Sequence, residues 1–217
     1  MTTPKKFMQV FDRLYAAYGP QHWWPGDTPF EIMIGAVLTQ NTSWTNVEKA
    51  IDNLNTNQAL HPQVILDTHH KRLASWLKPV GYFNVKAKRL KSYCAWYLQE
   101  GEIEVLAKLD TLSLRESLLS VNGVGPETAD DILLYAFERP VFVIDAYTKR
   151  LFSRLGYVGE DESYEVLRAT FEKKLQKHNK KVWLFNEYHA LIVHHAKYFC
   201  KTKPVCEHCC LKKRCQY

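Results

Sequence analysis

Val121-Asn-Gly-Val-Gly-Pro-Glu-Thr-Ala129 is the stretch that decides the fold, because it interrupts the chain sharply between two helical segments. Glycine permits positive φ and lets backbone amides come close to a ligand. Pro126 suits the first turn of a helix, where its missing N–H has no helical partner. We therefore expect a helical hairpin whose Gly123 and Gly125 amides point outward and bind a phosphate group.

The segments on both sides of this hairpin also carry helical signals. Apolar residues from Phe7 to Tyr18 recur with the spacing of one helix face. Thr28-Pro-Phe-Glu31 is a capping box that predicts a helix start, and Ser113-Leu-Arg-Glu116 predicts another that ends at Ser120. We expect further helices over residues 126–137, 146–155, 164–175 and 183–198. Only Val141-Phe-Val-Ile144 is strand-like, and four residues make no sheet, so the predicted class is all-α.

Composition narrows the classes of protein that need to be considered. The 217 residues suffice for one large domain or two small ones, and 46% hydrophobic with 24% charged residues is ordinary for a soluble globular protein. There is no apolar run long enough to cross a bilayer, and the N-terminus lacks the apolar core of a signal peptide. We therefore expect a cytoplasmic protein that has no membrane partner.

Positive charge gathers towards the C-terminus. Residues 173–217 contain 11 basic and 2 acidic side chains, whereas the rest of the chain contains 18 basic and 21 acidic. A basic region of this kind indicates a polyanionic partner, usually nucleic acid. A solvated basic face without a partner is the alternative that charge alone leaves open.

Five of the six cysteines fall within the last 18 residues, and such crowding in a cytosolic chain favours a metal centre over disulfides. Cys200, Cys206, Cys209 and Cys215 can supply four thiolates at one centre. Cys210 offers an alternative register for the third ligand. Cys94 lies on the apolar face of a predicted helix and is assigned to the core.

Most of the chain resembles the helix-hairpin-helix-GPD superfamily of DNA glycosylases, and endonuclease III in particular. The resemblance is carried by Leu-Thr-Gln-Asn-Thr (38–42), Gly-Tyr-Phe-Asn-Val-Lys-Ala-Lys (81–88), the hairpin, Val-Ile-Asp-Ala-Tyr (143–147) and the cysteine tail. It implies two helical lobes, one over residues 28–139 and the other over residues 1–27 plus 140–217. It also implies a 4Fe-4S cluster held by the loop at 200–215. The family spacing is C-x6-C-x2-C-x5-C, so this chain is one residue short in the first interval.

Asp145 stands where the family has its catalytic carboxylate. Cleavage of an N-glycosidic bond builds positive charge on the sugar, and a fixed carboxylate beside C1′ stabilises that charge and orients the attacking water. The structural alternative makes Asp145 a plain helix cap, and the two roles are compatible. Lyase-active members carry a lysine where this chain has Glu127, and a carboxylate forms no imine. Glu127 therefore predicts a monofunctional enzyme, in which this candidate catalytic residue faces the base pocket, assists the attacking water or only caps its helix.

The base pocket is expected to be aromatic. Trp23-Trp24-Pro25 together with Trp44 resembles the endonuclease III-like 3-methyladenine glycosylases, in which the equivalents of Trp24, Trp44, Glu127 and Asp145 line the pocket. Rings of this kind hold a cationic alkylated purine by stacking and cation–π attraction. The alternative is that these tryptophans only pack the protein interior. Ala36 stands where adenine mismatch glycosylases have their acid, so adenine excision by that route is not expected.

The resemblance assigns the duplex side to Gln40, which would enter the gap left by the flipped base, and to Tyr82, which would wedge into the opposite strand. Lys86, Lys88, Arg89 and Lys91 either meet phosphates or form a solvated face. A buried amide that satisfies loop backbone is the structural alternative for Gln40.

These residues predict a monomeric DNA glycosylase of base excision repair that acts on double-stranded DNA containing a damaged base. The expected substrate is an alkylated purine of the 3-methyladenine or 7-methylguanine type, and no β-lyase step is expected. A monofunctional uracil or thymine mismatch glycosylase is the first alternative. A non-catalytic helix-hairpin-helix DNA-binding module is the second. For the metal centre, zinc is the alternative to the iron–sulfur cluster.

Overall fold

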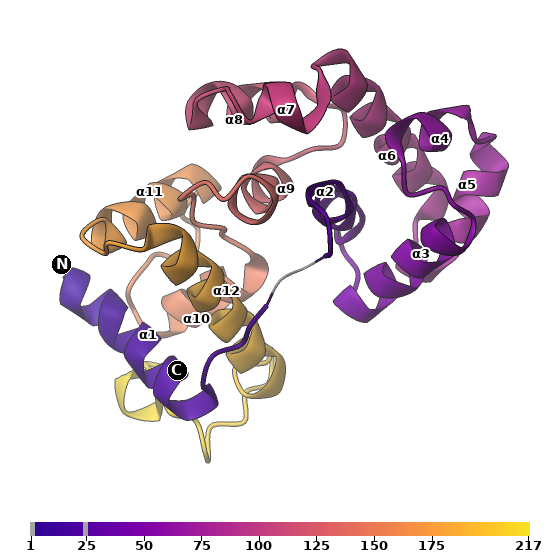
Figure 1. Cartoon of the computed structure of the whole chain (residues 1–217). Helices are drawn as coiled ribbons and strands as arrows, with labels where there is room; N and C mark the ends of the chain where they lie inside the picture. Colours follow the sequence, from indigo (N-terminus) through magenta and orange to yellow (C-terminus); the bar gives the residue numbers. More distant parts are fainter. Residues whose placement is uncertain (1–2, 24–25) are drawn as a thin grey trace. The chain divides into compact units, whose positions relative to one another are not determined.

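A computed structural model describes residues 3–23 and 26–217, and within these residues the secondary structure is entirely helical (Figure 1). The chain divides into two compact units. The middle unit is Trp24–Arg139, and the terminal unit combines Met1–Trp23 with Pro140–Tyr217. None of the helices in the described residues is both long and apolar enough to span a bilayer.

The middle unit is built around one almost completely buried helix, α2 (Pro29–Leu38). Every residue of α2 from Ile32 to Leu38 is buried, and the helix packs against α3, α6 and the turn η2 (Figure 1). Thr28 caps it, as the capping box predicts, because the Thr28 side chain accepts from Glu31 N–H at 3.1 Å. The other helices are α3 (Trp44–Thr56), α4 (Pro62–Asp67), α5 (His70–Trp76), the 3-10 turn η1 (Lys78–Val80), α6 (Phe83–Gln99), α7 (Glu102–Leu106), α8 (Thr111–Ser120), α9 (Pro126–Asp131) and the π-helical turn η2 (Ile132–Ala136).

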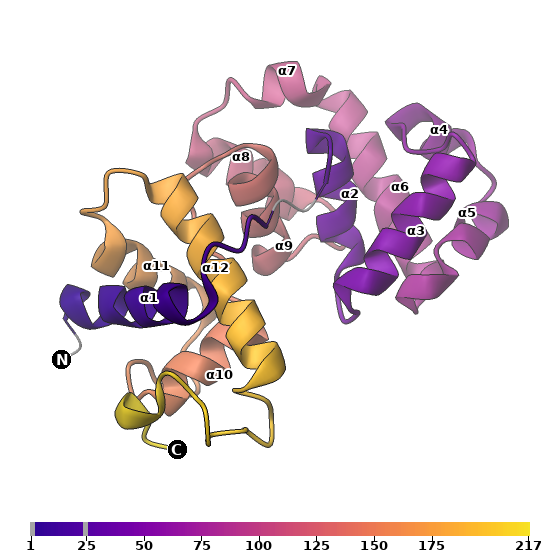
Figure 2. The same cartoon turned by 60° about the horizontal axis from the view of Figure 1, so that its bottom comes forward.

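The terminal unit comprises α1 (Pro4–Tyr18), α10 (Ala146–Arg154), α11 (Tyr164–Leu175), α12 (Lys181–Tyr198) and the 3-10 turn η3 (Lys212–Arg214). Its core is aromatic. Phe7 of α1 meets the ring of Phe152 at a centroid distance of 5.2 Å and that of Phe171 at 5.0 Å, while the Tyr188 hydroxyl donates to Phe7 O at 2.7 Å. Rings in these stacked and edge-on arrangements add to the stabilisation from area burial alone. The first helix is therefore fixed by elements from the last third of the chain, as Figure 2 shows for α1, α11 and α12.

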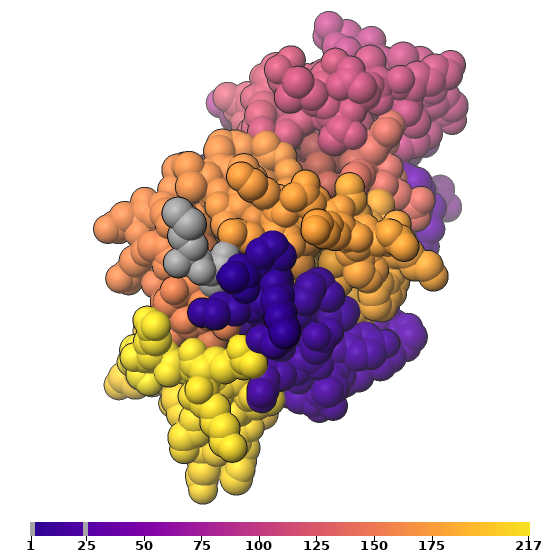
Figure 3. All heavy atoms as spheres, turned by 90° about the vertical axis from the view of Figure 1, so that its left-hand side faces the viewer, coloured from indigo at the N-terminus to yellow at the C-terminus, as the bar shows by residue number. Residues whose placement is uncertain are grey.

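The cysteine-rich C-terminal segment also packs against α1 within this unit. Figure 3 shows the C-terminal segment, in yellow, against the indigo N-terminal helix. The Tyr18 hydroxyl lies 2.7 Å from Nδ1 of His195 and 3.8 Å from Sγ of Cys210. The cysteine segment is thus attached to α1 as well as to α12.

Two details of the predicted secondary structure are wrong. Helix α8 begins at Thr111 rather than Ser113, because Asp110 is its cap and accepts from Leu112 and Ser113 N–H at 2.9 and 3.1 Å. The helix that was expected over residues 126–137 is regular only to Asp131, and it widens into η2 beyond that residue.

Candidate active site and DNA-contacting segments

Asp145 is held at the start of α10 by the segment that precedes it. Val141–Ile144 is buried but forms no strand, and its Phe142 N–H donates to the carboxylate of Glu172 at 3.1 Å. Asp145 follows with extended backbone and accepts from Thr148 N–H at 2.6 Å through Oδ1. Its side chain is 13% exposed, so solvent still reaches the carboxylate. The residue is therefore a helix cap with one partly accessible carboxylate group.

The second oxygen of Asp145 meets a histidine that the sequence did not single out. Nε2 of His189, on α12, lies 3.4 Å from Oδ2 of Asp145. Burial acts to raise the pKa of the Asp145 carboxyl, but the contact with His189 and the hydrogen bond from Thr148 N–H outweigh it. The net effect is a pKa below the ordinary value, so the carboxylate is ionised at neutral pH.

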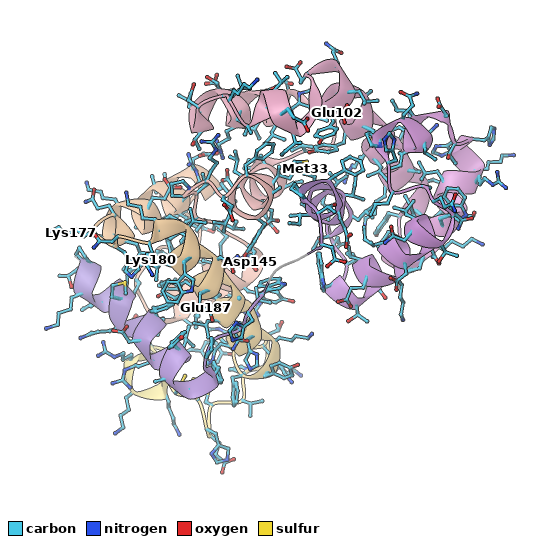
Figure 4. The ribbon with its side chains drawn as sticks, in the orientation of Figure 1. Met33, Glu102, Asp145, Lys177, Lys180 and Glu187 are labelled. Atoms are coloured by element: carbon cyan, nitrogen blue, oxygen red, sulfur yellow. The ribbon has the colours of Figure 1, made fainter. Side chains whose placement is uncertain are left out.

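Trp23 packs against this histidine. Its ring stacks on His189 with centroids 5.5 Å apart and planes inclined by 29°. Two residues earlier, Gln21 N–H donates to Glu187 Oε1 at 2.6 Å, which fixes the segment to α12. Figure 4 labels Glu187 and Asp145, which lie on α12 and at the start of α10. Within the terminal unit, Trp23 and Asp145 thus both contact the imidazole of His189.

The two glycines of the hairpin differ in their surroundings. Gly123 has φ +94°, and a β-carbon there would lie 2.4 Å from Cγ of Arg89. Gly125 has φ −97°, and a β-carbon there would meet nothing within 4 Å. Gly123 is therefore required by backbone conformation and close packing, whereas Gly125 leaves its amide at an open helix start.

Gln40 ties the loop after α2 to this hairpin. Its Nε2 donates to Gly123 O at 2.8 Å and to the Thr128 hydroxyl at 3.1 Å, while its Oε1 accepts from Arg89. Asn41, the next residue, takes positive φ, which asparagine tolerates better than most residues. In this structure the Gln40 side chain therefore bonds to the loop backbone and to neighbouring side chains. Entry of the Gln40 amide into a duplex would require these hydrogen bonds to break.

The remaining predicted pocket residues lie as follows. The half-buried Trp44 begins α3, and its ring packs on α2 where Gly35 leaves room, since a β-carbon on Gly35 would come within 3.0 Å of it. Glu127 is exposed in the first turn of α9, where a negative charge is favoured by the helix dipole. Trp24 lies outside the described residues.

Tyr82 is largely exposed to solvent. Its side chain is 71% exposed, and its φ of +44° places it at a left-handed position before α6. The turn is supported from beneath by Lys86, which is buried and donates to Val80 O at 2.8 Å. Burial lowers the pKa of Lys86 to about 8, with the nearby Arg89 charge adding to the effect.

The basic run on α6 is not one phosphate-facing stripe. Lys86 and Lys91 bind the backbone carbonyls of Val80 and Leu66, and Arg89 binds Gln40. Lys88 is exposed. Of the four, Lys88 is thus the side chain best placed to meet a phosphate.

Cys200, Cys206, Cys209 and Cys215 are among the residues that line one cavity of about 90 Å³ in the terminal unit. Cys210 does not line it and points instead at the Tyr18 hydroxyl. The described residues include no group of three His, Cys, Asp or Glu side chains close enough to share a single metal ion. Four cysteines are a donor set that fits an iron–sulfur cluster, and four thiolates also suit a zinc ion.

Arg154 and Lys212 contribute positive charge to the wall of this cavity. Arg154 Nη1 lies 3.4 Å from Cys200 Sγ and donates to Lys201 O at 2.6 Å, and its Nη2 donates to Thr202 O at 2.9 Å. Gln216 N–H donates to Arg154 O at 2.8 Å, so one residue fixes both ends of the cysteine loop. Thiolate ligands carry negative charge, which these contacts favour.

The helical hairpin, the capping aspartate that follows it and the cysteine loop are the features of a helix-hairpin-helix DNA repair protein. Residues 34–177 match the family model described as "HhH-GPD superfamily base excision DNA repair protein". A candidate DNA repair glycosylase of Methanocaldococcus jannaschii is 48% identical over 95% of this chain and 94% of that protein. Endonuclease III of Haemophilus influenzae is 30% identical over 88% of this chain and 85% of its own length.

Solved structures give the same result. The 3-methyladenine DNA glycosylase (MagIII) of H. pylori, bound to 1,N6-ethenoadenine, has a TM-score of 0.73 and 31% identity over 88% of this chain and 94% of its own. An endonuclease III–DNA complex has a TM-score of 0.83 over 100% of this chain and 96% of its own, which at 24% identity supports the fold. The chain belongs to the HhH-GPD superfamily of base excision DNA repair proteins. It is a DNA N-glycosylase, and it binds DNA.

Proposed function

We propose that this glycosylase is monofunctional and excises an alkylated purine of the 3-methyladenine or 7-methylguanine type from double-stranded DNA, acting as a monomer. The observation that carries the proposal is an ionised, partly accessible Asp145 in a chain with Glu127 at the lyase position. A carboxylate stabilises a developing cation but offers no amine for a Schiff base.

The proposed chemistry is hydrolysis at C1′ of an extruded nucleotide. As the N-glycosidic bond breaks, its electron pair goes to the ring nitrogen of a cationic alkylated purine, which leaves as a neutral base. The positive charge that builds on the sugar is stabilised by Asp145. Water adds to C1′, and its proton passes to the Asp145 carboxylate or to solvent. An alkylated purine needs no strong acid for the leaving group, and Ala36 supplies none at the position where adenine glycosylases have theirs.

The preference for alkylated purines is supported by the aromatic residues and by the likeness to MagIII. Trp44 stands half-buried at the start of α3, and Trp24 is assigned to the pocket by the sequence pattern. An electron-rich ring attracts a cationic base more strongly than a neutral one. The MagIII structure holds 1,N6-ethenoadenine, so a related protein accepts a modified purine.

Gln40 is proposed to enter the gap left by the extruded base, and Tyr82 to wedge into the opposite strand. The amides of Gly123 and Gly125, at the start of α9, are proposed to bind backbone phosphate. The 71% exposure of Tyr82 and the open surroundings of Gly125 support these roles.

Cys200, Cys206, Cys209 and Cys215 are proposed to hold a 4Fe-4S cluster. Such a cluster is bound by four thiolates and would cross-link the C-terminal segment. The cavity that these thiols line supports this ligand set, and the position of Cys210 outside it supports Cys209 as the third ligand. The ordered basic segment that results would present Lys212 and Arg214 to phosphates.

A lesion panel tests the proposal. Duplexes containing 3-methyladenine, 7-methylguanine, G·U or G·T are incubated with the protein, and the released bases are identified by chromatography. The expected result is release of the methylated purines and strand cleavage only after alkaline treatment. Strand cleavage without alkali and a borohydride-trapped adduct would contradict the monofunctional assignment. Release from G·U or G·T alone would favour the mismatch reading, and no release from any duplex would favour a DNA-binding module.

A further inference from the structure

His189 has no role in the chemistry set out so far, yet it lies against the carboxylate on which that chemistry depends. It is buried on α12, with 5% of its surface exposed. A polar ring in such a place is destabilising unless it gains a partner. Its neighbours are Oδ2 of Asp145 at 3.4 Å and the Trp23 ring at 5.5 Å between centroids. All three residues belong to the terminal unit.

Each oxygen of the Asp145 carboxylate is held by a different element. Oδ1 accepts from the backbone of α10 through Thr148 N–H at 2.6 Å. Oδ2 faces a side chain of α12, which crosses the unit independently. A carboxylate held only by its own helix cap can still rotate about its side-chain bonds, and a second contact from another helix restricts that rotation. Trp23, stacked on the imidazole, fixes the ring in turn.

We propose that His189 is a positioning residue for base excision, which orients the Asp145 carboxylate towards C1′ and is itself held in place by Trp23. The inference rests on the proposed function, because it assumes that Asp145 faces the extruded sugar. It also gives Trp23 a supporting role on the imidazole in place of a direct contact with the base. Precise placement of a catalytic group changes the rate of the chemical step much more than it changes DNA affinity.

The test measures single-turnover base release and DNA dissociation constants for a set of matched variants. His189→Phe keeps a flat ring beside Trp23 but loses the polar contact, and we expect release to slow roughly 10- to 100-fold, as for loss of one charge-assisted contact. His189→Gln places an amide nitrogen near the former Nε2 and should recover most of the rate. The dissociation constants should stay within about 2-fold, well below the change in rate.

Tyr188→Phe is the matched control. Tyr188 is the adjacent, equally buried residue of α12 and donates to Phe7 O in the aromatic core. This variant should lower the melting temperature without slowing base release. A His189→Phe enzyme that is as fast as the wild type overturns the inference. If His189→Phe does not fold, His189→Asn decides, since its shorter amide cannot reach Oδ2, and equal rates for the Asn and Gln variants overturn the inference.

The same experiment separates this inference from the proposed function. Wild type and Asp145→Asn are measured first on the lesion panel. An inactive wild type, or an active Asp145→Asn, removes the proposed function itself. An active wild type with an inactive Asp145→Asn and an unimpaired His189→Phe removes only the role assigned to His189.

Discussion

Asp145 ends a buried loop and caps α10, and in the proposed mechanism the same carboxylate also serves the substrate. Its hydrogen bond to Thr148 N–H explains why the residue keeps its place without DNA, and its 13% exposure keeps it available. The lowered pKa has a consequence for the pH dependence. A carboxyl with a depressed pKa stabilises the fold above its unfolded value of about 3.9, and this contribution is lost as pH falls through the folded value.

Base release should therefore stay constant as pH is lowered from about 7 to about 5, because Asp145 remains ionised over that range. The measurement is the single-turnover rate on alkylated duplex DNA across this range. Asp145→Asn should abolish release at every pH while keeping a folded protein, because asparagine also caps helices well. A rate that halves at about pH 6 in the wild type and in His189→Gln alike would contradict a lowered pKa of Asp145.

Asp130 is the second carboxylate with a large expected effect, and that effect is on stability. It is fully buried, and its carboxylate accepts hydrogen bonds from Nε and Nη2 of Arg115 at 2.6 and 3.2 Å. This ion pair joins α8 to α9. Asp130→Ala should lower the free energy of unfolding by about 3–5 kcal/mol, because the buried Arg115 then loses this ion pair. Chemical denaturation measures this. Glu116→Gln, at an exposed neighbouring position on α8, is the control and should change stability by less than about 0.5 kcal/mol.

Two residues of the candidate site show which features could be predicted from the sequence and which could not. Asp145 stood out because its position after the hairpin matches a family pattern. His189 did not stand out, because in a largely buried helix a lone histidine resembles any satisfied core residue. Its meaning depends on Asp145, 44 positions earlier, and on Trp23 near the N-terminus. No local pattern reports proximity of that kind.

At the scale of elements, the hairpin was predicted well from the sequence. The difference between its two glycines was not predicted. Its helix starts at Pro126 as predicted, but the sequence treats Gly123 and Gly125 alike. Their difference depends on Arg89, which packs on Gly123 from α6. The start of α8 was misplaced because Ser113 and Asp110 both resemble caps, and only the backbone geometry selects Asp110.

The two glycines should respond differently to alanine. Gly123→Ala requires a β-carbon at φ +94° and 2.4 Å from Arg89 Cγ, so it should cost about 1–3 kcal/mol and weaken DNA binding. Gly125→Ala meets no obstacle and should leave the melting temperature unchanged. Thermal unfolding and DNA-binding titrations measure both. A loss of DNA affinity in Gly125→Ala with an unchanged melting temperature would support close approach of a phosphate to that amide, and equal destabilisation by both changes would contradict this account.

The turn before α6 holds Tyr82 in a backbone conformation that L-residues adopt at a cost of roughly 1–2 kcal/mol. Tyr82→Gly should therefore give a protein at least as stable as the wild type, since glycine takes φ +44° freely. Base release from duplex DNA should nevertheless fall, because the exposed ring is lost. Tyr82→Ala keeps the strain and loses the ring, so it is the control for stability. A Tyr82→Gly variant with full activity would remove the wedge role.

At the scale of the whole molecule, the sequence predicts an all-helical protein of the HhH-GPD superfamily, and both are confirmed. The course of the cysteine segment was less predictable. With Cys209 and Cys210 adjacent, spacing alone leaves the register open, and the proposed choice of Cys209 depends on α1, where Tyr18 contacts the Cys210 thiol.

This arrangement predicts different outcomes for two neighbouring cysteines. Cys209→Ser should yield protein with reduced iron content, weak visible absorption and a lower melting temperature, because a cavity-lining thiol is lost. Cys210→Ser should keep iron and visible colour close to those of the wild type. Iron analysis and absorption spectra of freshly purified protein measure both. The reverse pattern would make Cys210 the third ligand.

The terminal unit is built from two segments that are far apart in the sequence, and this affects how the protein folds during translation. Helix α1 emerges from the ribosome before the side chains that cover Phe7 and Tyr18, which come from Phe152 onwards. Its apolar face therefore stays uncovered while the intervening unit is made and folds as a continuous stretch. Chaperone dependence during synthesis should consequently fall on α1 and end only when α12 and the cysteine segment have been translated.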